Sequence, residues 1–320
     1  MNISSVLIRP RKNGVIMDTG AARVAVDVPQ PVPNATHFVT HAHADHIGAA
    51  RSTEVLTSFT SHRILEAVGG YTSSAVPEGE SVELADVEVQ FITAGHIPGS
   101  AQVVVNDGVR VAVNGDFKTE PDILERGADV PEDVDVLILE TTFGAPRFQF
   151  PRRATTYRSI DQWIRANLDA NNHVVLYGYA VGKSQELTAF LNSMGIKPVV
   201  PEKTHRINEL LRLSDVPIGS EGWADHIAEP SVFVLPPNFS KIVPALELEF
   251  GRRIVAKSCS GWARNGFCLS SHADFKQTLG FVEAVDPKMV LTYGGNANGL
   301  ATALKGMGYD AQPLNRTIIL

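Results

Sequence analysis

The spacing of hydrophobic and polar positions divides the chain into a strand-rich first part and a second part in which helices and strands alternate. Up to about residue 140, short apolar or alternating runs predict strands. The clearest of these are Ala22–Val28, a hairpin over Val103–Asp116 that turns at Asp107-Gly108, and Val134–Glu140. From about Pro151 the pattern becomes one of helices and strands in turn.

In this later part the periodicity predicts two helices, three strands, and then a mixed closing segment. The helices are expected at Thr155–Ala170 and Val181–Gly195, and the strands at His173–Tyr179, Ser231–Pro236 and Arg253–Ser258. The closing segment is expected to contain a helix from about Ala273, a strand at Lys288–Tyr293 and a last helix. This order indicates an α/β protein: a sandwich of sheets with helices outside and an inserted smaller α/β unit.

Composition narrows the class of protein only a little. Hydrophobic residues make up 44% and charged residues 20% of the 320 residues, as in ordinary globular proteins. The N-terminal stretch has no long apolar region typical of a signal peptide, and the two cysteines form no CxxC pair, so we expect a cytoplasmic protein. The net charge of −7 argues mildly against a nucleic-acid partner, although bound metal ions reverse the sign of a cleft locally.

The stretch THAHADHIG (residues 40–48) crowds four candidate metal ligands into six positions. These are His41, His43, Asp45 and His46. The first three alternate, so an extended segment would point them the same way. Imidazole nitrogens and a carboxylate suit zinc and similar metals, and this density favours a metal site over isolated surface histidines.

Two further ligands are expected after later strands. His96 lies just past an apolar run, and Asp116 directly follows the predicted hairpin. Six such groups exceed what one tetrahedral zinc needs, and a pair of metals bridged by a carboxylate would use them. Asp18 is either a turn carboxylate or the group that accepts a hydrogen bond from a ligand histidine and fixes its tautomer.

These motifs make the chain recognisable. MDTG, HAHADH, GHIPGSA and NGDF resemble the metallo-β-lactamase superfamily, and LETTFG, VGKSQEL, SGWA and LSSHADF resemble its β-CASP nuclease branch. Within that branch the chain is most similar to ligase-associated DNA exonucleases and to archaeal mRNA 3′-end processing factor-like exonucleases. The resemblance implies an αββα sandwich over residues 1–148, a β-CASP insertion over 149–255 and a return segment over 256–320.

The resemblance also implies roles for individual residues. His41, His43 and His96 would hold one zinc, Asp45 and His46 a second metal, and Asp116 would bridge the two. His272 would be the general acid and Glu140 its orienting partner, because a carboxylate beside an imidazole favours the imidazolium. The catalytic set is therefore Asp45, Asp116, Glu140 and His272.

Three other features bear on substrate and metal. A predicted helix begins with Gly182, Lys183, Ser184 and Gln185. The start of a helix that carries a lysine and a hydroxyl is suited to binding a phosphate group of the substrate. Ser260 and Trp262 either line the same cleft, with the indole stacking on a base, or pack in the core. Tyr293 stands where many RNA-cleaving relatives have another histidine ligand, so the second site is expected to be weak or to take manganese.

The function expected from the resemblance is a metal-dependent nuclease that hydrolyses phosphodiester bonds. DNA and RNA stay evenly matched as substrates, and exonuclease action is favoured because no added RNA-binding domain is apparent. A homodimer and a functional link to a DNA ligase also fit the family. Two alternatives stay open: a small-ester or thioester metallo-hydrolase of the same fold, and a non-catalytic nucleic-acid-binding scaffold.

Overall fold

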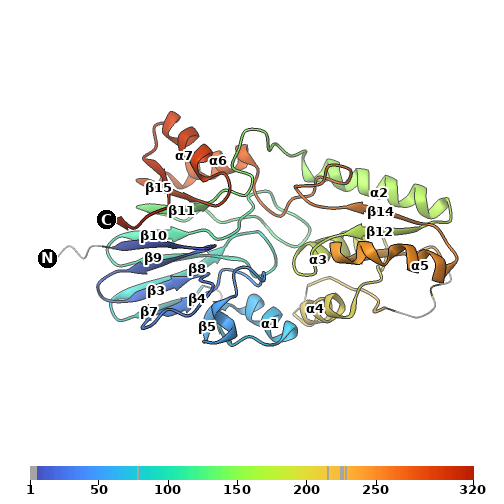
Figure 1. Ribbon diagram of the computed structural model, residues 1–320, viewed down its shortest axis with the longest axis horizontal. Helices are drawn as coiled ribbons and strands as arrows, with labels where there is room; N and C mark the ends of the chain where they lie inside the picture. The colour runs from blue at the N-terminus through green and yellow to red at the C-terminus, as the bar shows by residue number, and fades with distance from the viewer. Residues whose placement is uncertain (1–5, 78, 215, 224–226, 228) are drawn as a thin grey trace. The chain divides into compact units, whose positions relative to one another are not determined.

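The computed structural model describes residues 6–77, 79–214, 216–223, 227 and 229–320, and the chain forms two compact units (Figure 1). The first unit comprises Met1–Pro121, Arg126–Gln149 and His272–Leu320, and the second comprises Asp122–Glu125 and Phe150–Ser271. Among the described residues, no helix has both the length and the hydropathy that a membrane span requires.

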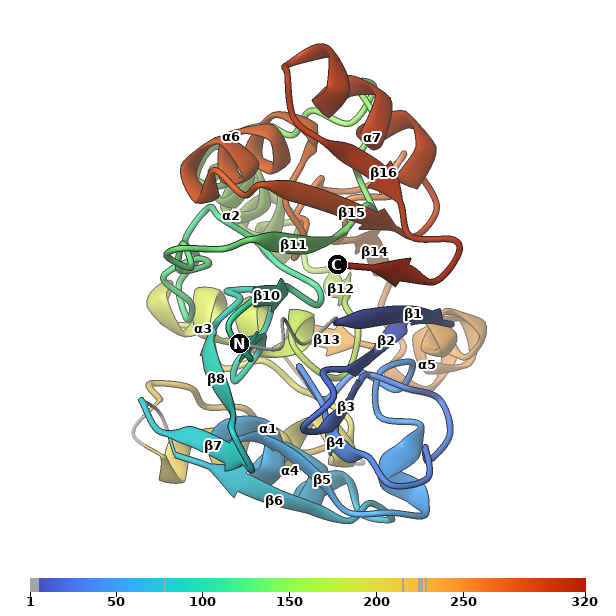
Figure 2. The ribbon, with the colours of Figure 1, turned by 90° about the vertical axis from the view of Figure 1, so that its left-hand side faces the viewer.

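Two seven-stranded sheets build the first unit (Figure 2). One has the order β17 (Ile318–Ile319), β1 (Leu7–Arg11), β2 (Gly14–Asp18), β3 (Arg23–Val26), β4 (Thr36–Phe38), β5 (Val55–Ser58), β6 (Ser73–Val76). The other has the order β16 (Ala311–Pro313), β15 (Met289–Tyr293), β11 (Val136–Glu140), β10 (Arg110–Val113), β9 (Ala101–Asn106), β8 (Val87–Thr93), β7 (Ser81–Leu84). The expected hairpin is present, with Asn106 opposite Arg110 and Gly108 at φ 75° in the turn.

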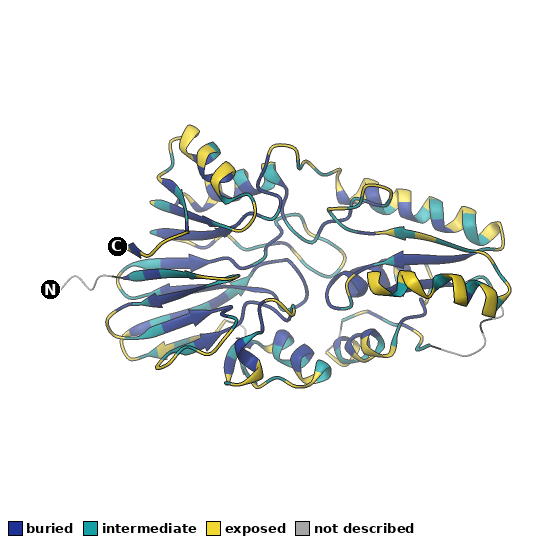
Figure 3. Cartoon of the chain, viewed as in Figure 1, coloured by how far each residue is buried: buried dark blue, intermediate teal, exposed yellow. Residues whose placement is uncertain are grey.

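A shared apolar core joins the inner faces of these two sheets, which appear as dark blue strands in Figure 3. It contains Val15 and Met17 of β2 together with Val103 and Val105 of β9. The alternation of burial along β8 shows why: every second side chain points inward. Helices cover the outer faces, because α6 (Phe275–Val285) and α7 (Ala297–Gly306) pack on the second sheet, and α1 (Phe59–Val68) packs on β5 and β6.

The second unit is a three-stranded parallel sheet with helices on both faces. Its order is β13 (Val232–Leu235), β12 (His173–Tyr177), β14 (Ile254–Ser258). One face packs on α2 (Arg153–Asp169) and α3 (Lys183–Ser193), and the other on α5 (Val243–Phe250); α4 (Glu202–Leu213) packs against α3.

The boundary expected at residue 255 differs from the structure, in which the second unit continues to Ser271. The reason is the pairing of β14 with β12, from His173 opposite Ile254 to Tyr177 opposite Ser258. The segment after Ser258 also stays with this unit, because Cys259 and Phe267 form a bridge beyond the strand. At its other end this part of the second unit begins at Phe150, directly after Gln149 of the first unit.

Candidate metal centre

Loops that follow strands of the first unit supply the candidate ligands. His41, His43 and His46 follow β4, whereas His96, Asp116 and Glu140 lie at the carboxyl ends of β8, β10 and β11. These last three strands run in the same direction, since β8 and β10 are each antiparallel to β9 and β11 is parallel to β10. Their carboxyl ends therefore lie along one edge of the sheet.

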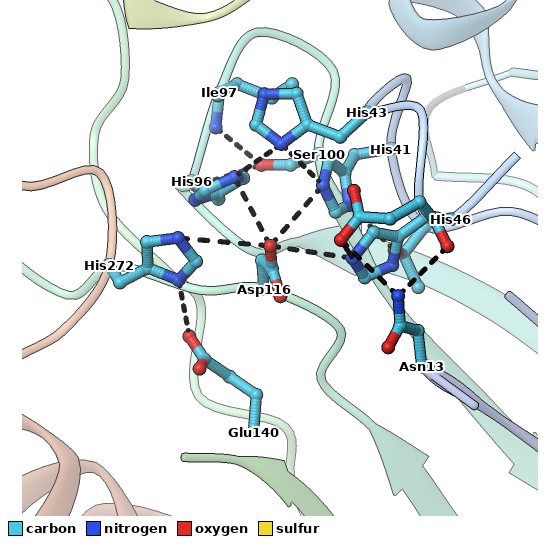
Figure 4. A network of polar contacts seen from close by, with 12 residues as sticks. Asn13, His41, His43, His46, His96, Ile97, Ser100, Asp116, Glu140 and His272 are labelled. Atoms are coloured by element: carbon cyan, nitrogen blue, oxygen red, sulfur yellow. Dashed lines mark hydrogen bonds and ion pairs between the residues drawn. The ribbon is translucent and has the colours of Figure 1, made fainter. Parts of the chain in front are cut away.

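Figure 4 shows the rings of His41, His46, His96 and His272 around the Asp116 carboxylate. Asp116 Oδ2 lies 3.6 Å from the Nε2 atoms of His41, His46 and His96, and 3.9 Å from that of His272. Gly115 allows this approach: its φ is +57°, and a Cβ there would lie 2.7 Å from the Thr40 side chain. The sequence NGD thus places a carboxylate at the centre of the cluster.

The distances among four donor atoms fit a tetrahedral metal. His43 Nδ1 lies 3.0 Å from His41 Nε2 and 3.2 Å from His96 Nε2, and Asp116 Oδ2 is 3.6 Å from each of the latter two atoms. Ligands at zinc-like bond lengths of about 2.0–2.1 Å stand about 3.3 Å apart at the corners of a tetrahedron. These four residues can therefore hold one ion between them.

Asp27 fixes the proton positions that such a site needs. Its carboxylate accepts hydrogen bonds from the backbone N–H of Thr40 at 2.8 Å and from the Thr40 hydroxyl at 2.7 Å. Because that hydroxyl proton is committed, His41 Nδ1 donates to Thr40 Oγ1 over 3.0 Å, and His41 Nε2 is left as an acceptor facing the cluster. His46 Nδ1 likewise lies 2.8 Å from Asp27 Oδ2, which leaves its Nε2 facing Asp116.

The electrostatics agree with this arrangement. Burial lowers the pKa of His41 well below its usual range, and the neighbouring His46 and His43 lower it further, so its imidazole is neutral and able to bind a metal. Burial also lowers the pKa of His46, but Asp116 and Asp27 raise it more, and it lies well above its usual range. The two carboxylates thus favour a positive charge at His46 Nε2, which a proton or a metal ion can supply.

Asp45 and His46 stand apart from the tetrahedral group. Asp45 Oδ2 lies 3.8 Å from His46 Nε2, and the Asp45 side chain is 65% exposed. Residues 40–42 form bends and residues 44–46 a turn in which the His46 N–H donates to the His43 carbonyl, so this stretch lacks the extended backbone that the expected alternation requires. Asn13 donates to the backbone oxygen of Asp45 at 3.2 Å and holds this loop.

His272 and Glu140 form a pair beside the cluster. His272 Nδ1 lies 2.8 Å from Glu140 Oε1, and the other Glu140 oxygen accepts from the backbone N–H of Thr142 at 2.7 Å. Although burial lowers the pKa of His272, Glu140 and then Asp116 raise it above its usual value. The imidazolium is therefore favoured, with Nε2 directed toward Asp116.

Two roles were open for Asp18, and in the structure its carboxylate pairs with Arg9 and Arg23. Asp27 occupies the outer position instead, and sequence reasoning missed it. The signal that could have found it is a lone aspartate at the end of a predicted strand; the structure gives it φ 52°, an unusual backbone angle for a non-glycine residue.

The residues expected to bind substrate phosphate are built into the second unit. Lys183 is buried and forms an ion pair with Glu186, Ser184 Oγ donates to the Gly178 carbonyl, and Gln185 Oε1 accepts from the Gly182 N–H. These partners favour a structural role for the side chains, and phosphate binding by Gly182, Lys183, Ser184 and Gln185 stays a prediction.

Tyr293 ends β15, opposite Glu140 in the parallel register. Burial, with the nearby Asp116 and Glu140 charges acting the same way, raises the pKa of Tyr293 well above its usual range. A neutral phenol is a poor metal ligand, so Tyr293 adds no donor to Asp45, His46 and Asp116, whose binding of a second metal stays a prediction.

Comparisons with known proteins agree with the motifs. The chain is 30% identical over 298 residues to a probable DNA ligase of Opitutus terrae, and the match covers 87% of this chain and 28% of the relative. It is 26% identical to an RNase J-like protein of Methanocaldococcus jannaschii, over 60% of this chain and 52% of the relative. It is 23% identical to the DNA cross-link repair protein SNM1 of Arabidopsis thaliana, over 82% of this chain and 61% of the relative.

The chain belongs to the β-CASP branch of the metallo-β-lactamase superfamily. No protein-family model matches the chain. A crystal structure of a protein of unknown function from Enterococcus faecalis has the same fold, with a TM-score of 0.66, 10% identity and 99% of both chains covered. The chain spans between about a quarter and two thirds of the length of the three relatives above.

Proposed function

We propose that this protein is a metal-dependent nuclease that hydrolyses phosphodiester bonds of DNA or RNA. The observation that carries the proposal is a tetrahedral group of three histidine nitrogens and one Asp116 oxygen directly beside a His272–Glu140 pair. The relatives named for RNase and DNA cross-link repair activities support this reading over a small-ester hydrolase.

Zinc fits the first site because its donors are His41, His43, His96 and Asp116. Asp45 and His46 would hold a second metal, with Asp116 shared, and this weaker donor set suits zinc or manganese. Bound metal would supply Lewis-acid activation of the attacking water and neutralise charge on the phosphate.

His272 has the position and charge of a general acid. Its Nδ1 is held by Glu140 over 2.8 Å, so the proton on Nε2 is the one available to a leaving oxygen near Asp116. Glu140 is fixed in turn by the Thr142 N–H, and it keeps the ring oriented and charged. In Figure 4, His272 and Glu140 lie on one side of Asp116, and His41 and His46 lie on another. The attacking oxygen and the leaving oxygen of one phosphate would therefore face different groups of side chains.

We infer an αββα metallo-β-lactamase sandwich for the first unit and a β-CASP domain for the second. The DNA ligase relative supports a functional link to a ligase, and this favours DNA exonuclease action slightly. A homodimer stays a prediction from the family.

The decisive experiment incubates the purified protein with 5′-labelled and 3′-labelled single strands of DNA and RNA and with duplex DNA, in zinc and in manganese separately. We expect metal-dependent cleavage, and the label pattern gives substrate and polarity together. Asp116→Ala removes an oxygen shared by both donor groups, so we expect hydrolysis to fall by more than about 10³-fold. Asp310→Ala, which alters an exposed carboxylate after α7, is the matched control and should cleave normally.

Full activity of Asp116→Ala with unchanged metal content would contradict the proposal. Bound metal without cleavage of any strand would favour the small-ester hydrolase or the nucleic-acid-binding scaffold.

A further inference from the structure

The second unit contains a pocket of about 510 Å³ at one edge of its sheet. The pocket lies where all three parallel strands end, since Tyr177 is the last residue of β12, Leu235 of β13 and Ser258 of β14, and the three are in register. Its volume is within the range of about 300–1,000 Å³ that is usual for small-molecule sites.

The strand order makes this edge of the sheet the point where successive connections run to opposite sides of the central strand. The chain leaves the central strand β12, passes through α3 and α4 to β13 on one side, and then crosses through α5 to β14 on the other side. The carboxyl end of β12 is therefore a topological switch point. In open α/β sheets, ligands bind in the crevice outside the carboxyl ends of the strands at such a point.

The walls carry two exposed aromatic rings and an exposed cation. Tyr179 is 61% exposed, Trp262 is 57% exposed, and Arg264 is also exposed, and all three line the pocket. Lys257 contributes part of a wall while its ammonium lies 4.8 Å from the centre of the Phe267 ring. Exposed aromatic rings offer flat faces on which a nucleobase can stack.

The charged side chains that line the pocket are positive. The described residues that line the pocket include Lys257 and Arg264 but no aspartate or glutamate, in a chain whose net charge is −7. Hydroxyl and amide groups of Ser258, Ser260 and Asn265 supply neutral hydrogen-bonding partners. Flat aromatic rings with a cation and no carboxylate match a nucleobase attached to a phosphate.

We propose that this pocket binds one nucleotide of a single-stranded nucleic acid, with the base stacked on Trp262 or Tyr179 and Arg264 contacting the adjoining phosphate. The proposal rests on the proposed function and adds a place where the strand is held outside the metal centre. Stacking would be tolerant of base identity, because every base offers a flat face.

The test measures binding of a fluorescent oligothymidylate of about ten nucleotides. The Asp116→Ala protein is used as the parent so that the strand stays intact. Adding Trp262→Ala should weaken binding by about 5- to 150-fold, the equivalent of about 1–3 kcal/mol for one stacked base. Adding Trp262→Phe should restore most of the affinity, which a loss of folding would not allow. Leu248→Ala, at an 85% exposed position on α5, is the control and should bind as the parent does.

An abasic strand of the same length separates stacking from charge. We expect it to bind the parent weakly and to be insensitive to Trp262→Ala, whereas Arg264→Gln should weaken binding of both strands. Equal binding of oligothymidylate by the parent and Trp262→Ala would overturn the proposal. Hydrolysis of bis(p-nitrophenyl) phosphate by the unaltered protein, which involves no base, reports on the proposed function separately.

Discussion

The Glu140 carboxylate determines up to what pH His272 stays protonated. Burial lowers the pKa of His272, but the Glu140 carboxylate 2.8 Å away raises it above the usual histidine value. A general acid works only in its protonated form, so activity should be present below this raised pKa and lost as pH rises through it. Glu140→Gln removes the raising charge while keeping an oxygen that can accept from Nδ1.

We therefore expect Glu140→Gln to move the alkaline limb of the pH–kcat profile to lower pH. At alkaline pH, kcat should fall by up to about 10²-fold, as general-acid catalysis commonly contributes that much or more. The control is Glu283→Gln, at an exposed position on α6. An alkaline limb that does not move would show that Glu140 does not hold the His272 proton.

At this scale the sequence pointed to side chains that the fold brings together, but not to their outer partners. His41, His43, His96 and Asp116 do converge, because each follows a strand of the first unit. Asp18 and Asp27 both follow or end a strand, and nothing local separates them. Only the folded chain shows that Asp27 reaches Thr40 and His46.

At the scale of elements, the start of α3 shows how local chemistry can be read in two ways. Its lysine and hydroxyl suited a phosphate site, yet Glu186 on the same helix takes hydrogen bonds from Lys183, Arg153 and Tyr157 in the interior. The partner Arg153 lies on α2, about thirty positions earlier, and a pattern of hydrophobic spacing carries no information about such a contact. Arg153 also donates to the Ser270 carbonyl, so one network joins α2, α3 and the segment after β14.

We expect Glu186→Gln to destabilise the second unit by about 3–5 kcal/mol, because it removes the carboxylate that two buried cations share. Denaturant unfolding followed by circular dichroism measures the change. The matched control is Glu209→Gln on α4, which breaks an exposed pair with Arg212 and should leave the midpoint unchanged. A variant as stable as the parent would mean that the network adds no net stability.

At the scale of the whole molecule, the pattern gave the class of fold and most of the longer elements. The helices expected at Thr155–Ala170 and Val181–Gly195 are α2 and α3 with slightly different ends. It did not give strand order, because β1 pairs with β17 from the other end of the chain and β11 pairs with β15 across the second unit's sequence. Register over such separations depends on packing of both sheet faces, which no short window contains.

Metal binding should couple the two sheets of the first unit, since its candidate ligands come from loops of both. His41, His43 and His46 follow β4 of one sheet, whereas His96 and Asp116 follow strands of the other. An ion that binds only the folded form stabilises it by about 2.7 kcal/mol when its concentration is one hundred times its dissociation constant, equivalent to roughly 5–10 °C in melting temperature.

We expect calorimetry to show a fall of this size in the melting temperature when a chelator removes the metal, and recovery when zinc is returned. Asp116→Ala should lose most of the zinc-dependent shift and Asp310→Ala none of it. A melting temperature that ignores both chelator and zinc would contradict a metal held between the sheets, because donor atoms 3.0–3.6 Å apart gain stability from a shared ion only if that ion binds.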